Sequence, residues 1–431
     1  MSHLVFVDSN FSGIEGLRRA RELGHQFTAV MSETLQYYHR NDATRRVLAG
    51  AERVLWIDRT TDPIQLAGAL REILAERPID AIISHLDDCI EPLAQVCVEL
   101  GLRYTSAEGA RLARNKHLCR ERLQSAGIPS ARFAFARTVD EAVAGFRAVG
   151  SPAVVKPTSG NDSMFAAIVH DEASVRRAAA AALDGVAALP STLRAQFARG
   201  LVIEEKLIGE LVSAEVGMFE DRPLHYVISG RHRGATDEVV ELAGFLPARL
   251  DPVTWRACED YAVRVCRALG LDRGIFHIEM IVTADGPRLV EANPRLMGGA
   301  MPILYERFTG HSLQDHLIAL HLGAPLPVPA LPERRAAASH RIHAARAGVI
   351  SDGARFDWLA DYAPHIVYLD TSPLVSGKHC AAGEPIGRFQ LLHESPERID
   401  ELASTLLDRF ESTIGVPLMR WAGCRNSRQF Q

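Results

Sequence analysis

Two glutamates in a predicted β-hairpin are the residues best placed to do chemistry in this chain. The segment 276–299, FHIEMIVTADGPRLVEANPRLMGG, alternates apolar and polar side chains around Asp285-Gly286, a dipeptide typical of tight hairpin turns. Folding the strands about this turn places Glu279 opposite Glu291, give or take one residue. Directly paired residues have Cβ atoms about 4.5–5.5 Å apart, and two carboxylates that close repel each other unless a cation lies between them.

An amide and a guanidinium follow the second glutamate along the chain. Asn293 shares a face with Glu291, and its amide oxygen completes an all-oxygen set suited to Mg²⁺. Arg295 can face the anions that such an ion carries. A solvated hairpin with acidic outer positions is the simpler interpretation of most Glu–Glu pairs. Because Glu-Ala-Asn-Pro-Arg follows a hydrophobic strand and runs into Gly298-Gly299, we favour a metal-phosphate site.

Two lysines are candidates for holding a polyphosphate. Lys156 ends a predicted buried strand at 153–155, and the small polar turn 158–163 that follows is rich in backbone N–H donors. A hairpin whose lysine extends towards solvent is the alternative. Lys116 lies on a helix predicted from the capping-box pattern at 105–108 to about residue 125. By itself Lys116 has the character of a surface residue.

The composition is that of an ordinary globular protein. The 431 residues predict two to four domains, and 47% hydrophobic with 23% charged residues excludes a disordered chain. A net charge of −5 gives no reason to expect nucleic acid as a partner. Seven scattered cysteines without a CxxC pair indicate reduced thiols. With no signal-peptide pattern and no apolar run near the ~20 residues that span a bilayer, we expect a cytoplasmic protein without a membrane partner.

The N-terminal part alternates predicted strands with helices, which indicates a parallel sheet. Its predicted strands are 3–8, 26–31, 53–57 and 81–84, and its predicted helices are 14–23 and 63–76. Asp87 and Asp88 follow the last strand, where open α/β sheets bind ligands, although a helix N-cap role explains them equally well. The first turn lacks GxGxxG, so a dinucleotide site is only weakly supported.

The rest of the chain carries further strands and one basic cluster. The predicted strand 224–229 runs into Arg231-His232-Arg233, which could face phosphates or a carboxylate substrate; a solvated turn is the alternative. The Pro-rich stretch 324–333 indicates a connector. Beyond it we predict short strands at 341–343 and 365–369 and a long helix at 396–413.

Taken in order, these motifs resemble the ATP-grasp superfamily of carboxylate–amine (or thiol) ligases. The resemblance rests on Lys116, Val155-Lys156-Pro157, Glu204-Glu205-Lys206-Leu207, Gly209-Glu210, Glu279 and Glu291-Ala-Asn293-Pro-Arg295. It implies an α/β protein whose grasp domain is α+β. The implied domains are a Rossmann-like N-terminal domain at 1–108, an ATP-grasp domain at 109–322 and a C-terminal α+β domain at 323–431. Within the grasp, the small nucleotide-binding subdomain would cover about 120–200 and the large one about 201–322.

The resemblance also implies a role for each candidate residue. Lys116 and Lys156 would hold the α- and β-phosphates of ATP, and Ser163 would contact the nucleotide from the protein's phosphate loop. Adenine would bind backbone groups of Glu205, Lys206 and Leu207. The ribose would bind Glu210 or, in another alignment, Glu215. Mg²⁺, with Mn²⁺ as an alternative, would bind Glu279, Glu291 and Asn293. Arg295 would stabilise an anionic tetrahedral species, and Gly298-Gly299, Arg233 and Glu241 would contact the substrates.

Within the superfamily, Asn293-Pro294-Arg295 with Gly298-Gly299 is most similar to the L-amino acid ligases of dipeptide-antibiotic pathways. This implies an ADP-forming ligase that joins a carboxylate to an amine, both of amino-acid type, through an acyl phosphate. Small molecules would be its partners, and a homodimer is common among such proteins. Two features depart from the pattern. The phosphate loop 159–165 has a single glycine, and no histidine closely follows Glu241.

Other interpretations remain open at this point. An ATP-grasp ligase of nucleotide or cofactor synthesis, acting on a small carboxylate or bicarbonate, is the nearest one. A biotin-dependent carboxylase is disfavoured, since no biotin-acceptor lysine segment is visible. A nucleotide-binding regulator that lost turnover would keep the grasp, but the presence of both carboxylates and Arg295 argues against it. A nicotinamide dehydrogenase is the most distant alternative.

Overall fold

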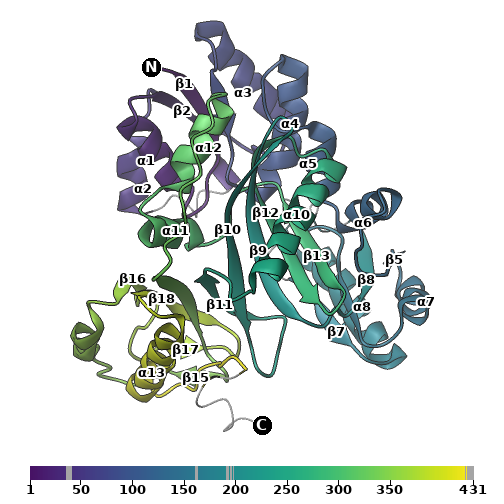
Figure 1. Cartoon of the computed structure of the whole chain (residues 1–431), viewed down its shortest axis with the longest axis vertical. Helices are drawn as coiled ribbons and strands as arrows, with labels where there is room; N and C mark the ends of the chain where they lie inside the picture. Colours follow the sequence, from purple (N-terminus) through teal and green to yellow (C-terminus); the bar gives the residue numbers. More distant parts are fainter. Residues whose placement is uncertain are drawn as a thin grey trace. The chain divides into compact units, whose positions relative to one another are not determined.

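The computed structural model describes residues 1–34, 41–160, 164–190, 194, 197, 199–422 and 424. These residues form two compact units, coloured along the chain in Figure 1. The first unit contains Met1–Tyr226, Asp251–Pro302 and Ser312–Val328, and the second contains Val227–Leu250, Ile303–His311 and Pro329–Gln431. Strand β10 (Arg222–Arg233) and helix α11 (Met301–Thr309) are the elements that pass from one to the other.

The first unit begins with the predicted parallel sheet. Its strands are β1 (His3–Val7), β2 (Gln26–Ser32), β3 (Arg53–Ile57) and β4 (Ala81–Ile83), in the order β3-β2-β1-β4. All three pairings are parallel, which confirms the α/β prediction. The helices are α1 (Ile14–Glu22), α2 (Asp42–Leu48), α3 (Pro63–Glu76) and α4 (Asp87–Leu100). Helices α3 and α4 pack on the face of the sheet that carries Val5 and Val7 (Figure 1).

The helix predicted to continue to residue 125 is in fact two helices, α5 (Ala107–Ala113) and α6 (Lys116–Ser125). Asn115 interrupts it because its side chain caps α6, accepting the backbone N–H of Leu118 at 3.1 Å. Helix α5 is capped by Ser106 and not by the Thr105 of the predicted capping box. Lys116 therefore begins a helix and is not a mid-helix surface residue.

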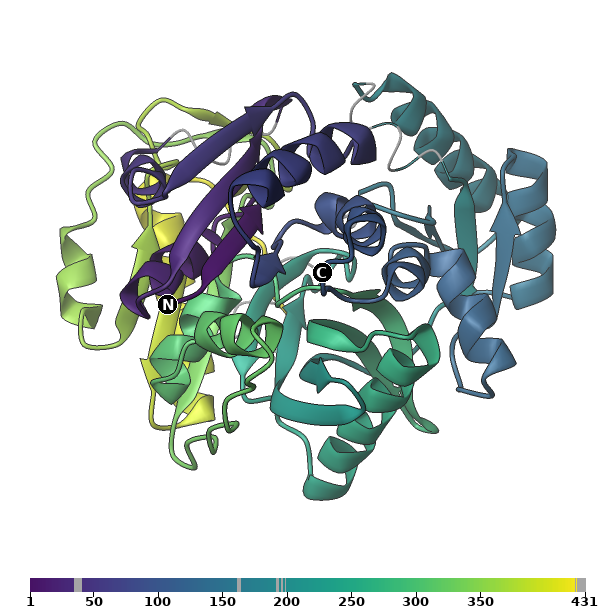
Figure 2. The ribbon, with the colours of Figure 1, turned by 90° about the horizontal axis from the view of Figure 1, so that it is seen from above.

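A small antiparallel sheet follows, with β5 (Phe133–Ala136), β8 (Leu201–Glu205), β6 (Ala153–Pro157) and β7 (Ala167–Val169) in that order. Helices α7 (Val139–Val149) and α8 (Glu172–Ala188) share one apolar core with it (Figure 2). Because β8 pairs with both β5 and β6, the small sheet extends past the predicted subdomain boundary at residue 200. Glu205 is thus the end of an interior strand.

The large sheet of the first unit carries the predicted hairpin. Strands β9 (Glu210–Phe219), β12 (Arg273–Thr283) and β13 (Gly286–Asn293) lie in the order β13-β12-β9, with β13 at the edge. Helix α10 (Pro252–Leu269) packs against β13 and β9, and α12 (Leu313–His321) lies beside α1 (Figure 1). The turn of the hairpin is Ala284-Asp285, one residue earlier than the predicted Asp285-Gly286.

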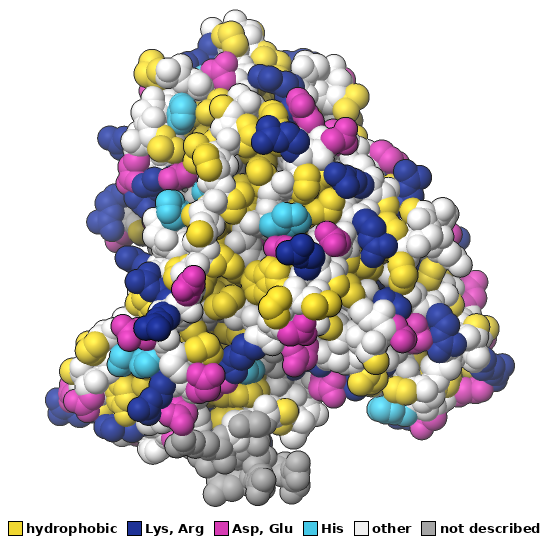
Figure 3. Space-filling view, viewed as in Figure 1, with side chains coloured by type: hydrophobic (Ala, Val, Ile, Leu, Met, Phe, Trp, Pro, Cys, Tyr) yellow, Lys and Arg dark blue, Asp and Glu magenta, His cyan; other side chains and the backbone are white. Residues whose placement is uncertain are grey.

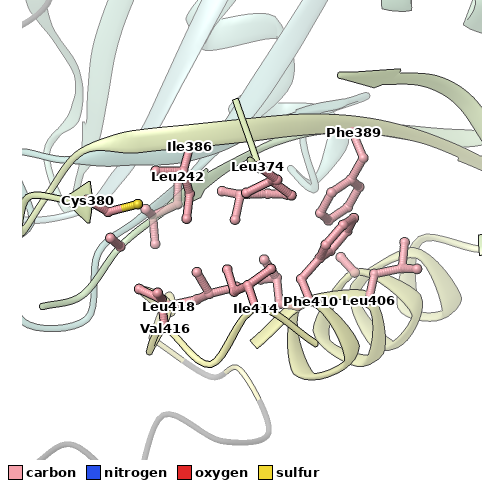
Figure 4. Packing of buried hydrophobic residues seen from close by; sticks show 14 of the residues in the cluster. Leu242, Leu374, Cys380, Ile386, Phe389, Leu406, Phe410, Ile414, Val416 and Leu418 are labelled. Atoms are coloured by element: carbon pink, nitrogen blue, oxygen red, sulfur yellow. The ribbon is translucent and has the colours of Figure 1, made fainter. Parts of the chain in front are cut away.

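The second unit has a core between a sheet and one long helix (Figure 4). Its strands include β11 (Glu241–Leu246), β14 (Ala336–His343), β18 (Pro385–His393) and β16 (Ile366–Asp370), adjacent in that order, and the helix is α13 (Pro396–Ile414). Two short strands, β15 (Gly348–Val349) and β17 (His379–Cys380), pair separately, and η2 (Asp357–Tyr362) is a 3₁₀ turn. The predicted strands and helix of this region are present, whereas β18 was not predicted.

The charges on the surface are mixed, as the small net charge of the composition predicts (Figure 3). On the face drawn in Figure 3, basic and acidic side chains are interspersed, in keeping with the net charge of −5. All seven cysteines are buried and free. Among the residues that the structure describes, no helix is both long and apolar enough to cross a membrane.

His85 makes the stability of the first unit depend on pH. Its buried ring stacks on Phe6, and its Nε2 lies 2.8 Å from Gln314 Oε1. Burial lowers the pKa of His85 to about 4, against the opposing effect of the bond to Gln314. Between pH 6.5 and 4 the unfolded chain binds a proton here that the folded chain does not. The free energy of unfolding therefore falls as the pH decreases, by about 3 kcal/mol over this window.

We expect the thermal midpoint to drop as the buffer is changed from pH 7.5 to pH 5, and to drop less in His85→Gln. His170, an exposed histidine, provides the matched control, because His170→Gln should keep the wild-type pH dependence. Differential scanning fluorimetry across the pH series measures all three proteins. A His85→Gln curve parallel to that of the wild type would contradict the assignment.

Candidate active site

A β-bulge at Val290 decides where Glu291 points. Strands β12 and β13 pair without interruption from the turn as far as Met280 and Leu289, and then the register shifts so that Glu279 faces Glu291. Val290 is the extra residue, and one extra residue moves every later side chain to the other face of its strand. Glu279 and Glu291 therefore lie opposite each other, as predicted, and 20% of each side chain is exposed.

Asn293 and His277 complete the polar face beside Glu279. Asn293 Nδ2 donates to Glu279 Oε1 at 3.2 Å, and His277 Nε2 lies 3.3 Å from the same oxygen. His277 Nδ1 pairs with the buried Glu215, whose second oxygen accepts the backbone N–H of Met297 at 3.0 Å. Burial alone would lower the pKa of His277, but Glu215 and Glu279 raise it to about 9. A charged imidazole thus offsets part of the carboxylate repulsion.

Lys116 joins helix α6 to this face. Its Nζ lies 2.7 Å from Glu291 Oε1, and its backbone N–H donates to the carbonyl of Thr158 at 2.7 Å. Only 11% of its side chain is exposed, because the start of α6 abuts the loop after β6. Helix N-termini and lysines both favour anions, so this position suits a phosphate.

Lys156 lies at the end of β6 in a buried ionic network. Its Nζ is 2.7 Å from Glu204 Oε2, and Arg120 Nε is 2.9 Å from the other carboxylate oxygen. Burial lowers the pKa of Lys156; Glu204 opposes this shift, and the charges of Arg120 and Lys116 add to it. A further negative group near Lys156, such as a phosphate, would therefore favour its charged form.

Arg295 is held by an acidic residue at the start of helix α4. Its Nε lies 2.7 Å from Asp87 Oδ2, and its Nη1 donates to the carbonyl of Leu296 at 2.7 Å. Asp87 also pairs with Arg114, at 3.3 Å. Burial alone would raise the pKa of Asp87, but Arg295 and Arg114 hold it below its usual range. The N-cap of α4 is Leu86, so Asp87 does not cap the helix; its carboxylate instead orients Arg295.

The carboxylate pair fits a magnesium ion that is completed by other ligands. Among the described residues, no group of three or more His, Cys, Asp or Glu side chains is arranged to hold a metal alone. Glu279, Glu291 and Asn293 nevertheless place two carboxylates and an amide together on neighbouring strands. Mg²⁺ commonly takes only one or two protein carboxylates and fills its octahedral shell with phosphate and water.

Comparison with known proteins identifies the family. A family model described as an ATP-grasp domain matches residues 149–302, and one described as an ATP-grasp N-terminal domain matches residues 17–102. The chain belongs to the ATP-grasp superfamily. The crystal structure of an L-amino acid ligase from Bacillus licheniformis has the same fold, with a TM-score of 0.76 at 18% identity over 98% of this chain and 99% of that chain.

Two curated ATP-grasp relatives match part of the sequence. Carnosine synthase 1 of Gallus gallus is 28% identical over 327 residues, which cover 72% of this chain and 33% of that protein. Dapdiamide A synthase of Enterobacter agglomerans is 28% identical over 232 residues, which cover 53% of this chain and 51% of that protein. The matched region thus spans between a third and about half of the length of these relatives.

The remaining predicted nucleotide residues lie around the end of β8. Glu205 pairs through its side chain with Arg132, at 2.8 Å, and the backbone N–H of Lys206 donates to the carbonyl of Pro152 at 2.9 Å. Glu210 is exposed at the start of β9. Ser163, the predicted phosphate-loop residue, lies outside the described residues.

The predicted substrate residues divide between the two units of the ATP-grasp chain. In the first unit Gly299 has a φ of 60°, a left-handed conformation that glycine adopts without strain. In the second unit Arg233 pairs with Glu238 at 3.3 Å, and Glu241 pairs with Arg231 at 3.3 Å. The cluster predicted at 231–233 is therefore tied into local ion pairs.

Sequence reasoning missed three buried residues that support the site: Arg120, Glu204 as the partner of Lys156, and His277. Two signals were present. Arg120 follows Lys116 by one helical turn, so the two side chains share a face of α6. His277 and Glu279 alternate along β12 and so also share a face. Neither pattern indicates that these residues are buried, and burial is the reason why they influence the charge and orientation of the neighbouring site residues.

Proposed function

We propose that this ATP-grasp protein is an ADP-forming ligase that joins the carboxylate of one small molecule to the amine of another, both of amino-acid type. The observation that carries the proposal is the pairing of Glu279 with Glu291 across β12 and β13, with Lys116 on one carboxylate and Asn293 on the other. Paired carboxylates flanked by lysines and an arginine suit phosphoryl transfer, which needs charge neutralisation and positioning more than acid–base chemistry.

The chemistry explains why ATP is required. At neutral pH both reactants are ionised, and a carboxylate oxygen is a poor leaving group, so direct condensation is unfavourable. Attack of the carboxylate oxygen on the γ-phosphorus of ATP forms an acyl phosphate and releases ADP. The free amine then attacks the acyl carbon, forms the C–N bond and expels phosphate, while the ammonium proton is lost. A water-poor pocket is needed, because hydrolysis competes with the second step.

The lysines would hold the polyphosphate. Lys116 and Lys156 now contact Glu291 and Glu204, and we propose that phosphate oxygens become additional partners when ATP binds. Glu279, Glu291 and Asn293 would hold Mg²⁺, which when bound neutralises phosphate charge and orients the transferred group. The same oxygen donors would accept Mn²⁺.

The adenosine would bind at the end of β8. We propose that the backbone of Glu205 to Leu207 contacts adenine, since the side chain of Glu205 is already held by Arg132. For the ribose we favour Glu210 over Glu215. Glu215 is buried and its carboxylate serves His277 and Met297, whereas Glu210 is exposed.

The amino-acid character of the substrates is proposed from the names of similar proteins. Two relatives are named as carnosine and dapdiamide A synthases, and a protein of the same fold is an L-amino acid ligase. We propose that Arg295 and the backbone N–H groups of Gly298-Gly299 receive carboxylate oxygens of a substrate. Arg233 and Glu241 are proposed to contact the second substrate. Such a pair of substrates would give a dipeptide, and we propose that the product belongs to dipeptide-antibiotic synthesis.

A substrate-pair screen tests the proposal. Purified protein is incubated with ATP, Mg²⁺ and pairs of amino acids; released phosphate is measured, and condensed products are identified by mass spectrometry. We expect phosphate release with at least one pair, together with a product lighter than the sum of its reactants by one water. ATP binding without phosphate release from any pair would instead favour a regulator. Phosphate release with bicarbonate or another small acid alone would favour a ligase of nucleotide or cofactor synthesis.

A further inference from the structure

Arg120 is a deeply buried charged side chain that pairs with Glu204, the partner of Lys156. It lies on α6, four residues after Lys116, and only 1% of it is exposed. A buried guanidinium is costly unless it is paired and hydrogen-bonded, so its partners need an explanation. These partners come from two elements far apart in the sequence, the bulged strand β13 and the interior strand β8.

The first partner is the bulge itself. Arg120 Nη2 donates to the carbonyl of Val290 at 2.8 Å. Val290 is the residue without a counterpart on β12, and β13 is the edge of its sheet. A bulged residue loses ladder hydrogen bonds, so an external donor stabilises it. Since the bulge sets Glu291 opposite Glu279, a group that holds Val290 also holds the geometry of the carboxylate pair.

The second partner belongs to the lysine network. Arg120 Nε lies 2.9 Å from one oxygen of Glu204, and the other oxygen lies 2.7 Å from Lys156 Nζ. Glu204 is therefore shared between Arg120 and Lys156. The charge of Arg120 keeps Glu204 ionised and orients it, and Glu204 in turn fixes the ammonium of Lys156 at the end of β6.

We infer that Arg120 is a positioning residue that couples the metal-binding carboxylates to the phosphate-binding lysine. The inference rests on the proposed nucleotide site, not on the identity of the substrates. It assigns Arg120 two simultaneous tasks, holding the Val290 carbonyl and orienting Glu204. Lysine keeps the charge but has one ammonium nitrogen in place of the two guanidinium nitrogens, Nη2 and Nε, that make these contacts, so we expect it to lose one of them.

The test is the affinity for ADP measured by calorimetry with and without Mg²⁺. For Arg120→Lys we expect the gain in ADP affinity produced by Mg²⁺ to fall by about tenfold, the usual scale for groups that support metal ligands. Arg122→Lys is the matched control. Arg122 lies on the same helix and also donates to a backbone carbonyl, that of Ala268 at 2.7 Å, but it is exposed. This control should bind ADP as the wild type does.

Two outcomes would overturn the inference. One is a wild-type response to Mg²⁺ in Arg120→Lys, and the other is an equal loss in Arg122→Lys, which would trace the effect to general loosening of α6. If Arg120→Lys does not fold, Glu204→Gln tests the lysine half of the coupling, because it should weaken ADP binding by a similar factor with and without Mg²⁺. Wild-type affinity in Glu204→Gln would also refute the coupling. Failure of the substrate-pair screen with normal ADP binding would sink the ligase proposal alone.

Discussion

Glu291→Gln should abolish ATP turnover and leave the protein folded. The substitution removes one of two opposed carboxylates, so a divalent ion loses a charged ligand. Glutamine keeps the size of the side chain and an acceptor for Lys116, which now lies 2.7 Å from Glu291. Metal ions contribute several kcal/mol to stabilising the charge of a transition state, and we expect a loss on the order of 10³-fold in ADP release.

The circular dichroism spectrum should be measured on the same samples as ADP release. Glu121→Gln is the matched control, since Glu121 is a glutamate on α6 with 54% of its side chain exposed. Glu279→Gln should reproduce the loss, because we propose that both carboxylates bind the same ion. Unchanged turnover in Glu291→Gln would count against the metal site. Loss of the helical and strand signal in the circular dichroism spectrum would show that the substitution prevents folding.

Arg295→Ala should uncouple the two halves of the proposed reaction. We propose that Arg295 stabilises the oxyanion that forms when the amine attacks the acyl carbon, and removing one such donor typically costs about 10²–10³-fold in rate. We therefore expect condensed product to fall by this factor while ADP formation falls less, with hydrolysis accounting for the difference. The ratio of product to ADP, followed by mass spectrometry and a coupled assay, measures the effect.

The contact with Asp87 provides an independent variant for the same step. Asp87→Asn leaves Arg295 in place but removes the charge that orients its guanidinium, at 2.7 Å. Misplacing a group near the reacting atoms can cost up to about 10²-fold, so the product-to-ADP ratio should fall in the same direction. Arg288→Ala is the control, because Arg288 lies on β13 and its Nη1 donates to the carbonyls of Asp285 and Pro287 beside the turn. If Arg295→Ala hydrolyses and ligates at wild-type rates, the proposed role of Arg295 is contradicted.

Local patterns were sufficient for much of the fold. The alternation of strands and helices predicted the parallel sheet of β1 to β4, and helix α3 begins and ends where its pattern does. One predicted helix is two helices in the structure, α5 and α6. Residues 105–125 are compatible with one continuous helix, and it is the cap by Asn115, with Arg114 turned towards Asp87, that divides it. The break also frees the backbone N–H of Lys116 to donate to the carbonyl of Thr158, a contact with a distant part of the chain that the local pattern does not show.

The pairing of Glu279 with Glu291 came partly from the sequence. The residue types and the turn signal predicted a hairpin with facing carboxylates, but a two-residue turn at Ala284-Asp285 with regular pairing would place Val290 opposite Glu279. The bulge restores the predicted pair. A bulge loses ladder hydrogen bonds, and here Arg120 of helix α6 supplies a donor to the bulged residue. The spacing of residues along β13 does not reveal this contact.

By itself the sequence determined the chemical groups of this site and their order along the chain: two lysines, two glutamates, an asparagine and an arginine. Only the tertiary structure decided which of them are held, and by what. Asp87 holds Arg295, Glu204 holds Lys156 and Arg120 fixes the bulge beside Glu291. The physical reason is burial, because a charged side chain removed from water must find its partner among residues that only folding brings near it.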